Sequence, residues 1–483
     1  VAAGEYTEPK ITITKNLTII GEDRENTIIK PSVNFTGANH SDNAAWFVVN
    51  DGVTFNLSDV TLDAEGKNVL VGIMSHGSGS IENNIFKNIR GGHDYNGVAI
   101  ELLGSDMTVT GNTFSNIQRI GVFIGQNSDT AGAVIQANTY VGKGTGNFLD
   151  YAFEVGRDGR AEIIGNTISG NKGIASTDNS SSAGIQITSY YGSGASHAII
   201  EDNVISDCSI GVLVGYDNND ISVVTINENN LEGNGIGIKS TAPTVNGKRN
   251  WWGANDASGI LELISCNVDF EPWYTSEAMG ELVYRYSVVN QDLEASYETI
   301  QAAIDAADAG DIIKVAPGVY NENISIIKPL TLLGATHGID KTSEAYNTVT
   351  SDGTWDTSQE SVIQSPDPSQ RMSCVVDIKG ASDVTFDGFV VQELHAVGAQ
   401  YDSLVRVSAK EPPRATIQNI NVINNIIGPF TNIEGQDGSQ GRMGLYIVND
   451  PYNANVGVIN STFAHNRIFG AEGNGNNVFI WSA

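Results

Sequence analysis

The sequence predicts an all-β solenoid, in which short strands stack in parallel from one coil to the next. Three observations predict it: a motif of fixed period, short apolar segments between its copies, and a composition rich in Gly and poor in charge. The motif has six positions. They hold an apolar residue, two polar or small residues, a fourth residue that is usually Asn, a residue of any type and another apolar residue. It recurs every 26 to 28 residues, with one gap of 37, and its central Asn residues are Asn84, Asn112, Asn138, Asn166, Asn203 and Asn229. A period of this length is typical of a solenoid.

The segments between the motifs predict strands rather than helices. Each holds three to five residues, is rich in β-branched side chains, alternates in and out, and is bounded by Gly, Asn or Asp. They lie at 97–100, 121–124, 152–155, 184–187 and 211–214. Parallel strands of consecutive coils stack about 4.8 Å apart. Each Asn then lies above its predecessor, so we interpret the six Asn residues as a structural ladder inside a turn.

Composition restricts the class of protein and its partners. Gly accounts for 53 of 483 residues and charged residues for only 17%, which suits short strands and tight turns. The net charge of −30 makes nucleic acid and anionic membranes poor partners. No run of 18 apolar residues is present, so no membrane insertion is expected. The acidity fits cation binding, a salty environment or simple solubility, and it does not choose among them.

The chain contains the same opening segment twice, which predicts two solenoids in tandem. Residues 1–21 match residues 315–334 with one extra residue in the first copy. Only the second copy is preceded by a helical pattern, at about 297–308, with Ser296 as a possible N-cap and Gly310 after its end. This helix would cover the open apolar end of the second solenoid. We predict a first domain at 1–275, a linker at 276–295 and a second domain at 296–483.

Two segments resemble a known family, the right-handed parallel β-helix repeat proteins of bacterial and archaeal cell surfaces. Residues 299–322 are similar to its opening segment, TIQAAIDAA…GD.I.VAPG.Y.E, and residues 250–273 to its closing segment, NWWG…NVDF.PW. The resemblance implies two tandem right-handed parallel β-helices, with one short capping α-helix before the second. It implies little about activity, because the same repeat serves in pectate lyases, pectinases, alginate epimerases, adhesins and surface-layer proteins.

The two ends of the chain allow two interpretations. Val1 begins inside the opening motif, and Ala483 follows the apolar segment 478–480 without a closing segment. The chain is either a fragment of a longer tandem protein or a subunit whose last coil continues into the first coil of the next. The second interpretation predicts head-to-tail assembly, so the partner would be a second copy of the chain.

The outward-facing column of one predicted sheet is the best candidate for a binding surface. Aromatic residues on a flat sheet can stack on sugar rings and a carboxylate can bind hydroxyls, yet the same column could lie under a loop or a partner. In the first solenoid we expect Ala99, Phe123, Glu154, Gln186, Leu213 and Lys239 in this column, and in the second Arg406, Tyr446 and Phe479. The candidates for glycan or partner binding are Phe123, Glu154, Gln186, Arg406, Tyr446 and Phe479.

Candidates for catalysis and for metal binding are weaker. An acid and base cluster could form from Asp150, Glu154, Arg157, Asp158 and Arg160. The catalytic signatures expected from the resemblance, such as RIK, DFIFG and DPHS, are absent from the sequence. Asp217 and Asp220 offer oxygen ligands for Ca²⁺ without the spacing of a dedicated loop, and no other cofactor is expected.

Together these observations favour an extracellular structural or adhesive protein, such as a cell-surface, surface-layer, sheath or filament component. Its partners would be other copies of itself or a cell-surface polysaccharide. The alternative is a secreted polysaccharide lyase or glycoside hydrolase, or a glycan-binding module without turnover.

Overall fold

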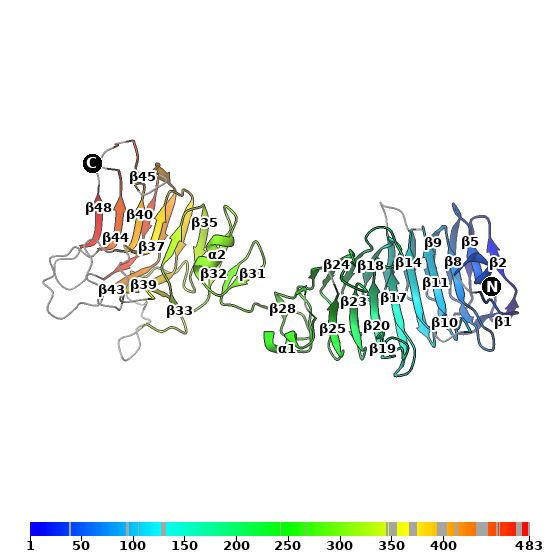
Figure 1. The fold of residues 1–483 in the computed structure, drawn as a ribbon. Helices are drawn as coiled ribbons and strands as arrows, with labels where there is room; N and C mark the ends of the chain where they lie inside the picture. The colour runs from blue at the N-terminus through cyan, green and yellow to red at the C-terminus, as the bar shows by residue number, and fades with distance from the viewer. Residues whose placement is uncertain are drawn as a thin grey trace. The chain divides into compact units, whose positions relative to one another are not determined.

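The computed structural model shows two compact units, Val1–Val283 (unit 1) and Tyr284–Ala483 (unit 2) (Figure 1). The structure describes the whole chain except the following residues: 38–39, 93–95, 105, 127–131, 242, 266, 344–345, 347–354, 367–373, 394–402, 411–413, 431–442, 451–452, 454, 470–475 and 482–483. Among the described residues, no helix has the length and apolar character needed to cross a membrane.

Unit 1 is built from three sheets of stacked parallel strands, which we call A, B and C. Sheet A contains β1 (Gly4–Glu8), β4 (Thr27–Pro31), β7 (Thr61–Asp63), β10 (Ile85–Lys87), β13 (Thr113–Ser115), β16 (Thr139–Gly144), β19 (Thr167–Asn171) and β22 (Val204–Ser206). Sheet B contains β2 (Ile11–Ile13), β5 (Ala45–Val49), β8 (Val71–Ser75), β11 (Val98–Leu103), β14 (Ile120–Gly125), β17 (Tyr151–Val155), β20 (Ala183–Ile187), β23 (Ile210–Val214) and β25 (Ile236–Ser240). Sheet C contains β3 (Leu17–Ile20), β6 (Thr54–Ser58), β9 (Ser78–Glu82), β12 (Met107–Thr110), β15 (Ala133–Gln136), β18 (Arg160–Ile164), β21 (His197–Glu201), β24 (Val223–Asn227), β26 (Val245–Asn246) and β27 (Val268–Asp269).

From β1 to β24, each coil of unit 1 supplies one strand to each sheet in the order A, B, C, and the next coil repeats the order in register (Figure 1). The apolar side chains of the three sheets meet inside the coil and form a continuous core, as in Phe86, Phe114 and Ile163, which are fully buried. Because each coil buries its apolar residues only against its neighbours, the sequence period and the structural repeat coincide.

The last coils of unit 1 are closed by aromatic side chains and a short helix. Trp252, Phe270 and Trp273 join the core, and α1 (Ala257–Leu261) contributes the buried Ile260. A hairpin of β28 (Trp273–Tyr274) and β29 (Leu282–Val283) follows. Sequence analysis did not predict α1, because five residues are too short to show a helical period. The Asp256 side chain caps the helix by accepting a hydrogen bond from the amide of Gly259 at 2.9 Å.

Unit 2 repeats the plan with sheets D, E and F. Sheet D contains β33 (Gly318–Asn321), β36 (Ser361–Gln364), β39 (Phe389–Glu393), β43 (Ile426–Phe430) and β47 (Arg467–Ile468). Sheet E contains β34 (Ile324–Ile326), β37 (Cys374–Lys379), β40 (Ser403–Ser408), β44 (Met443–Val448) and β48 (Asn476–Trp481). Sheet F contains β31 (Ala295–Tyr297), β30 (Val288–Asn290), β32 (Ile312–Val315), β35 (Leu330–Leu333), β38 (Val384–Asp387), β42 (Ile420–Ile423) and β46 (Thr462–Ala464), and β41 (Ile417–Gln418) pairs with β45 (Val458–Ile459).

A helix lies where unit 2 begins, as the sequence predicts. The helix α2 (Ile300–Ala306) buries Ile300, Ala303 and Ile304 in the core of the unit. Its N-cap is Thr299 rather than Ser296, because the Thr299 side chain accepts from the amide of Ala302 at 3.1 Å while Ser296 lies in β31. The Glu322 carboxylate accepts from the amides of Ile300 and Gln301, the first two residues of the helix, each at 2.8 Å.

The segment between the units differs from the predicted linker at 276–295. Its first part includes β29, which pairs with β28 in unit 1. Its second part includes β30, which pairs with β31 and with β32 in unit 2. The boundary therefore lies between Val283 and Tyr284. Sequence analysis missed these strands because two or three residues show no alternation.

Candidate functional site

The six predicted ladder Asn residues stack on one another inside unit 1. The side-chain oxygen of Asn138 accepts from the backbone amide and the side-chain nitrogen of Asn112, at 2.9 and 3.0 Å. The Asn138 side-chain nitrogen donates to the Val109 carbonyl and to Asn166. The other steps repeat this pattern, and the ladder continues one step further to Asn250. These side chains are buried and use their polar atoms within the fold, so they hold the coils together.

The outer face of sheet B carries the column that sequence analysis singled out, with one correction. Ala99 does not belong to it, because Ile100 pairs with Val122 and Glu101 with Phe123. The sequence prediction placed Ala99 beside Phe123, but Ala99 occupies the position of Gly121 in the next coil. A small residue is favoured at this position, because a Cβ atom on Gly121 would lie 2.5 Å from the Ala152 carbonyl oxygen. The column runs through Val48, Met74, Glu101, Phe123, Glu154, Gln186, Leu213 and Lys239.

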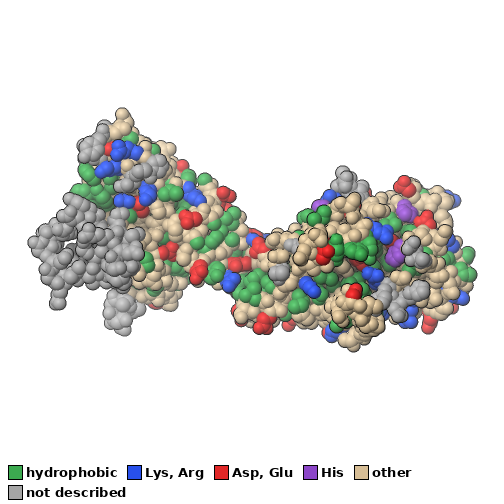
Figure 2. Space-filling model, in the orientation of Figure 1, with side chains coloured by type: hydrophobic (Ala, Val, Ile, Leu, Met, Phe, Trp, Pro, Cys, Tyr) green, Lys and Arg blue, Asp and Glu red, His purple; other side chains and the backbone are tan. Residues whose placement is uncertain are grey.

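This column is covered in its first part and open in its last part. All its members from Val48 to Glu154 are buried. Gln186 and Leu213 are half-buried, and Lys239 is exposed. The open part therefore begins at β20, the strand that follows Glu154, and extends over three neighbouring strands. Figure 2 shows that the visible surface of unit 1 mixes hydrophobic, basic and histidine side chains with acidic ones.

Glu101 and Phe123 lie under other side chains in the covered part. A ring nitrogen of His40 lies 3.0 Å from one carboxylate oxygen of Glu101, and the Arg157 guanidinium lies 3.6 Å from the other. The same guanidinium lies over the Phe123 ring, 5.3 Å from its centre. Phe123 therefore packs against Arg157 and offers no exposed ring face. Glu101 and His40 were not singled out from the sequence, because His40 lies 61 residues before Glu101 and meets it only through the stacking of coils.

Glu154 is the last buried member of the column and has fewer partners than Glu101. Its Oε2 atom is buried and accepts no hydrogen bond from the described residues. Burial raises the pKa of Glu154, and the charges of Arg119, His40 and Arg157 only partly oppose this shift. Glu154 therefore keeps its proton to a higher pH than an exposed glutamate does.

The other members of the predicted acid and base cluster do not converge on Glu154. The carboxylate of Asp150 is buried, accepts from the Tyr140 hydroxyl at 2.5 Å and pairs with Lys143 at 3.1 Å. Asp158 binds the backbone of a loop in the next coil. Arg160 lies in β18 of sheet C, in register with His197. The structure thus brings only Glu154 and Arg157 of this cluster to one place.

Three tyrosines form an exposed aromatic cluster beside the open part of sheet B, and sequence analysis missed it. Tyr190 and Tyr191 lie on the loop after β20, and Tyr216 follows β23, the neighbouring strand. Their exposed fractions are 57%, 52% and 43%. The Tyr190 ring makes edge-to-face contacts with both other rings, with centres 4.7 Å apart in each case. Adjacent aromatic residues at a strand end are the signal that could have revealed the cluster.

Two aspartates hold the loop that carries Tyr190 and Tyr191. The buried Asp220 accepts from the Thr188 hydroxyl at 3.1 Å and the Ser189 amide at 2.9 Å. Asp158 accepts from the Ser193 amide at 3.2 Å and the Gly194 amide at 2.7 Å. These backbone bonds, that of Gly194 first, lower the pKa of Asp158. The loop is thus fastened on both sides of its tyrosines.

The same contacts bear on the predicted calcium ligands. The second carboxylate oxygen of Asp220 accepts from the Ser222 amide at 2.9 Å, and Asp217 accepts from the Asn219 amide at 2.7 Å. No group of three or more potential His, Cys, Asp or Glu ligands occurs within the described part of the chain. Calcium binding at Asp217 and Asp220 stays a prediction.

In unit 2 the predicted residues lie in the equivalent column, on sheet E. Arg406 is in register with Tyr446, and Tyr446 with Phe479. Arg406 forms two hydrogen bonds to Asp377, at 2.8 and 2.7 Å, and Lys379 lies 2.9 Å from the same carboxylate. Burial alone would raise the pKa of Asp377, but the bonds and charge of Arg406 outweigh it and the pKa lies below its usual value. The charge of Arg406 is therefore already compensated.

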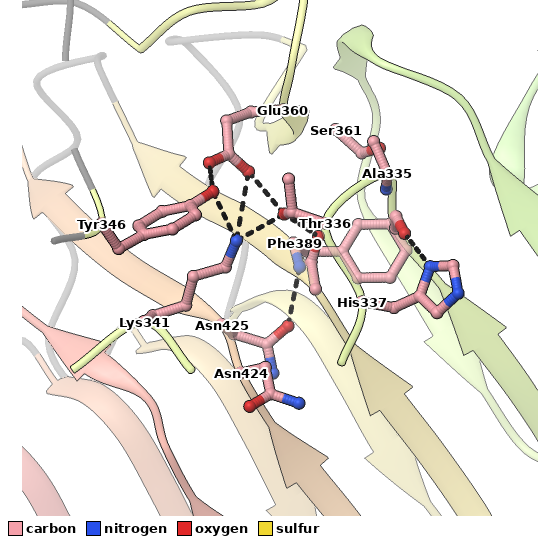
Figure 3. A network of polar contacts seen from close by, with 12 residues as sticks. Ala335, Thr336, His337, Lys341, Tyr346, Glu360, Ser361, Phe389, Asn424 and Asn425 are labelled. Carbon is pink, nitrogen blue, oxygen red and sulfur yellow. Dashed lines mark hydrogen bonds and ion pairs between the residues drawn. The ribbon is translucent and has the colours of Figure 1, made fainter. Parts of the chain in front are cut away.

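A second polar network in unit 2 surrounds a buried lysine (Figure 3). The Lys341 ammonium donates to the Thr336 hydroxyl and to the Tyr346 hydroxyl, each at 2.5 Å, and lies 3.7 Å from Glu360. The Thr336 and Tyr346 hydroxyls both donate to the Glu360 carboxylate. Burial lowers the pKa of Lys341 to about 8, against the opposing charge of Glu360. The Thr336 hydroxyl also lies 3.2 Å from the Gly388 carbonyl oxygen, so the network connects the segment before β36 with the turn before β39, and we interpret it as structural.

Comparison with protein families identifies the fold of unit 1 and the direction in which its coils wind. Residues 71–261 match the family model described as right handed beta helix region. This stretch extends from β8 to α1 and contains the open face and the tyrosine cluster. The solenoid is therefore a right-handed parallel β-helix. No curated protein matches the chain.

Several solved structures are similar to the chain at low identity. The catalytic domain of a GH87 alpha-1,3-glucanase in complex with nigerose is 12% identical, with a TM-score of 0.25, and the match covers 99% of this chain and 60% of that one. The A-module of the Azotobacter vinelandii mannuronan C-5 epimerase AlgE6 is 10% identical (TM-score 0.25), covering 100% of this chain and 89% of that one. The PL6 family alginate lyase AlyGC is 11% identical (TM-score 0.23), covering 99% and 85%. The chain thus spans 60% of the length of the glucanase domain.

Proposed function

We propose that unit 1 binds a polysaccharide on the open part of sheet B, against the three tyrosines. The observation that carries the proposal is the exposed cluster of Tyr190, Tyr191 and Tyr216 on a loop that Asp158 and Asp220 hold in place. Tyrosine presents a rigid apolar face with a polar tip, which suits a sugar ring with its apolar faces and hydroxyl edges. Because the loop is fastened before any ligand arrives, binding loses little conformational entropy.

The dimensions and polarity of the open part also fit a sugar chain. Gln186, Leu213 and Lys239 are in register on three neighbouring strands, about 4.8 Å apart. Gln186 offers hydrogen bonds to hydroxyl groups, Leu213 an apolar contact and Lys239 a cation. A sugar unit is about as long as this strand spacing, so an extended chain can follow the column.

The experiment is a binding measurement with soluble polysaccharides, neutral and acidic, by affinity electrophoresis and titration calorimetry. We expect Tyr190→Ala and Tyr216→Ala each to weaken binding about tenfold, because each ring contributes roughly 1 kcal/mol or more. The control is Ile199→Ala, which removes an apolar side chain of similar exposure, 42%, from sheet C. Tyrosine variants that bind as tightly as the wild type, or a protein that retains no polysaccharide, would contradict the proposal.

Binding of a polysaccharide without turnover is an adhesive function. Of the structural and adhesive roles that the sequence predicts, the open part of sheet B supports the adhesive one. A polysaccharide ligand is met at cell surfaces and in the medium, so the proposal includes an extracellular location. Head-to-tail assembly is independent of this face and stays a prediction, to be checked by the particle mass in solution.

A further inference from the structure

A short segment from an early coil contributes to the cover over the first part of sheet B. Residues 40–44, which we call the strap, lie between β4 and β5 in the second coil of unit 1. The His40 side chain reaches Glu101 on β11, two coils further on, and a ring nitrogen of His40 lies 3.0 Å from the Oε2 atom of Glu101. The strap therefore spans β8, which lies between β5 and β11 in sheet B.

The strap has two further polar anchors, and they are weaker or do not titrate near neutral pH. A carboxylate oxygen of Asp42 lies 3.0 Å from the Nε2 atom of His76, and the Lys10 ammonium donates to the Asp42 carbonyl oxygen at 2.7 Å. The side chains of Asp42 and His76 are 56% and 34% exposed, so water and salt screen their attraction. The Glu101 side chain is fully buried and that of His40 is 25% exposed, so the contact between His40 and Glu101 is the stronger of the two imidazole contacts.

Apolar burial holds the strap only weakly. Residues 41–43 are exposed, and the one buried apolar side chain of the strap is that of Ala44. It packs in an apolar cluster of the outer face that includes Val48 and Met74. Because the burial of one methyl group contributes little free energy, the polar contacts decide whether the strap stays on the sheet.

Two cations face the Glu101 carboxylate, one at each oxygen. His40 lies at Oε2, and the Arg157 guanidinium lies 3.6 Å from Oε1, which accepts no hydrogen bond from the described residues. The charge of His40 also acts on Glu154, as do the charges of Arg119 and Arg157. A neutral imidazole can still donate a hydrogen bond, but it no longer supplies a charge. Contact with water then becomes the more favourable way to stabilise the buried Glu101 carboxylate.

We propose that the strap is a pH-sensitive cover, which lies on sheet B while His40 carries a proton and lifts when that proton is lost. Histidine is the side chain whose charge ordinarily changes between about pH 5 and 8. The positive charge of His40 favours the closed state at the acidic end of this range, and the attraction to Glu101 disappears as the pH rises. Lifting the strap gives water access to Glu101 and Met74, so the accessible length of the face depends on pH. This device is independent of polysaccharide binding.

The test is amide hydrogen exchange of the full chain at about pH 5 and about pH 8, with each rate divided by that of an unstructured peptide at the same pH. The amides of Ala44 and Ala45 report on the strap, because they donate to the carbonyl oxygens of Ser41 and Asp42. We expect their protection to be about tenfold lower at the higher pH, because a hydrogen bond to a charged group contributes at least that factor.

Two variants separate a titrating cover from a merely structural imidazole. His40→Arg keeps a cation at both pH values, so the strap should stay protected at both. Glu101→Gln removes the buried charge without changing the shape, so the protection should no longer depend on pH. The matched control is His197→Gln, on β21 of sheet C, which should behave as the wild type does.

The amide of Asn112, which donates to the ladder residue Asn138, shows in every variant that unit 1 remains folded. Equal protection of Ala44 and Ala45 at both pH values in the wild type overturns the proposal. A pH dependence that survives unchanged in Glu101→Gln overturns it as well, since the loss of protection would then have another cause.

Discussion

Charged side chains that are buried in the two units differ in how fully they are paired. Lys341 has three polar partners, Asp377 has two cations, and Glu101 has a histidine and an arginine. A buried charge costs several kcal/mol unless it is paired and hydrogen-bonded. The buried Oε2 atom of Glu154 has no hydrogen-bond partner among the described residues, and burial raises the pKa of Glu154. Sequence analysis named Glu154 but had no means of ranking it above Asp150 or Asp158.

We predict that the stability of unit 1 decreases with pH because of Glu154. Its pKa is higher in the folded than in the unfolded chain, so between the two values the folded state binds more protons. The free energy of unfolding therefore falls as the pH rises above about 4.5, the usual glutamate value. Glu154→Gln should raise the thermal midpoint at pH 8 and leave it unchanged at pH 4, as measured by calorimetry. Equal midpoints for both proteins at pH 8 would refute the assignment.

We predict that replacing Lys341 by an uncharged residue strongly lowers the stability of unit 2. Lys341→Met leaves the Glu360 carboxylate buried without its cation, which should lower the free energy of unfolding by about 3–5 kcal/mol. Lys341→Met combined with Glu360→Gln should recover part of this loss, since no unpaired charge remains. Urea titration measures both, with Lys314→Met, an exposed lysine of β32, as the control. A variant as stable as the wild type would show that the network is not structural.

At the scale of elements, the loop with Tyr190 and Tyr191 shows how a surface segment is held rigid. Asp158 lies in the turn after β17, one coil before the loop, and Asp220 in the turn after β23, one coil beyond it. The loop is thus fastened from both neighbouring coils. The glycine at 192 is required by this arrangement, because a Cβ atom there would lie 1.9 Å from a carboxylate oxygen of Asp158.

Loss of the Asp158 contact should loosen the loop and weaken polysaccharide binding severalfold without unfolding unit 1. In Asp158→Ala the amides of Ser193 and Gly194 lose their acceptor, so their hydrogen exchange should accelerate. Exchange mass spectrometry on the wild type and the variant measures this, and Asp51→Ala, an exposed turn residue elsewhere in the unit, serves as control. The pKa of Asp158 is lower in the folded protein than the usual aspartate value of 3.8. The wild-type contact should therefore persist when the pH falls below 3.8, and it should be lost only when the pH falls through the lowered pKa of Asp158. Unchanged exchange in Asp158→Ala would mean that the loop is held without this aspartate.

The Asn ladder repeats in successive coils of unit 1 from Asn84 to Asn250, and its removal at one step should be costly. Asn138→Ala deprives the Asn112 amide and side chain of their acceptor inside the protein, and each buried unsatisfied group costs about 1–3 kcal/mol. We expect a loss of about 3 kcal/mol in the free energy of unfolding, measured with urea. Gln136→Ala, two residues earlier and exposed, should cost less than about 0.5 kcal/mol. Similar losses in the two variants would argue against a structural ladder.

At the scale of the whole molecule, the two units have separate cores. One core contains residues from Ile13 to Trp273, and the other contains residues from Val288 to Ile447. Since a solenoid transmits stability between neighbouring coils, each unit should unfold as its own unit. Calorimetry should resolve two transitions, of which Asn138→Ala lowers only one and Lys341→Met only the other. A variant that lowers both by the same amount would show that the units unfold together.

The sequence by itself determined the solenoid, its period, the tandem arrangement, the Asn ladder positions and most of the outward column. Apart from the tandem arrangement, these features recur in many coils and depend on local alternation and turn residues, so a single sequence shows them many times. Tertiary structure alone decided the place of Glu101, the contacts of Glu154 and Lys341, and the exposure of the tyrosines. Such properties depend on which residues of different coils meet, for example His40 and Glu101 across 61 positions, and on which part of a face the loops cover. Strand periodicity carries no information about contacts between coils or about coverage by loops, because both arise only when the coils have stacked.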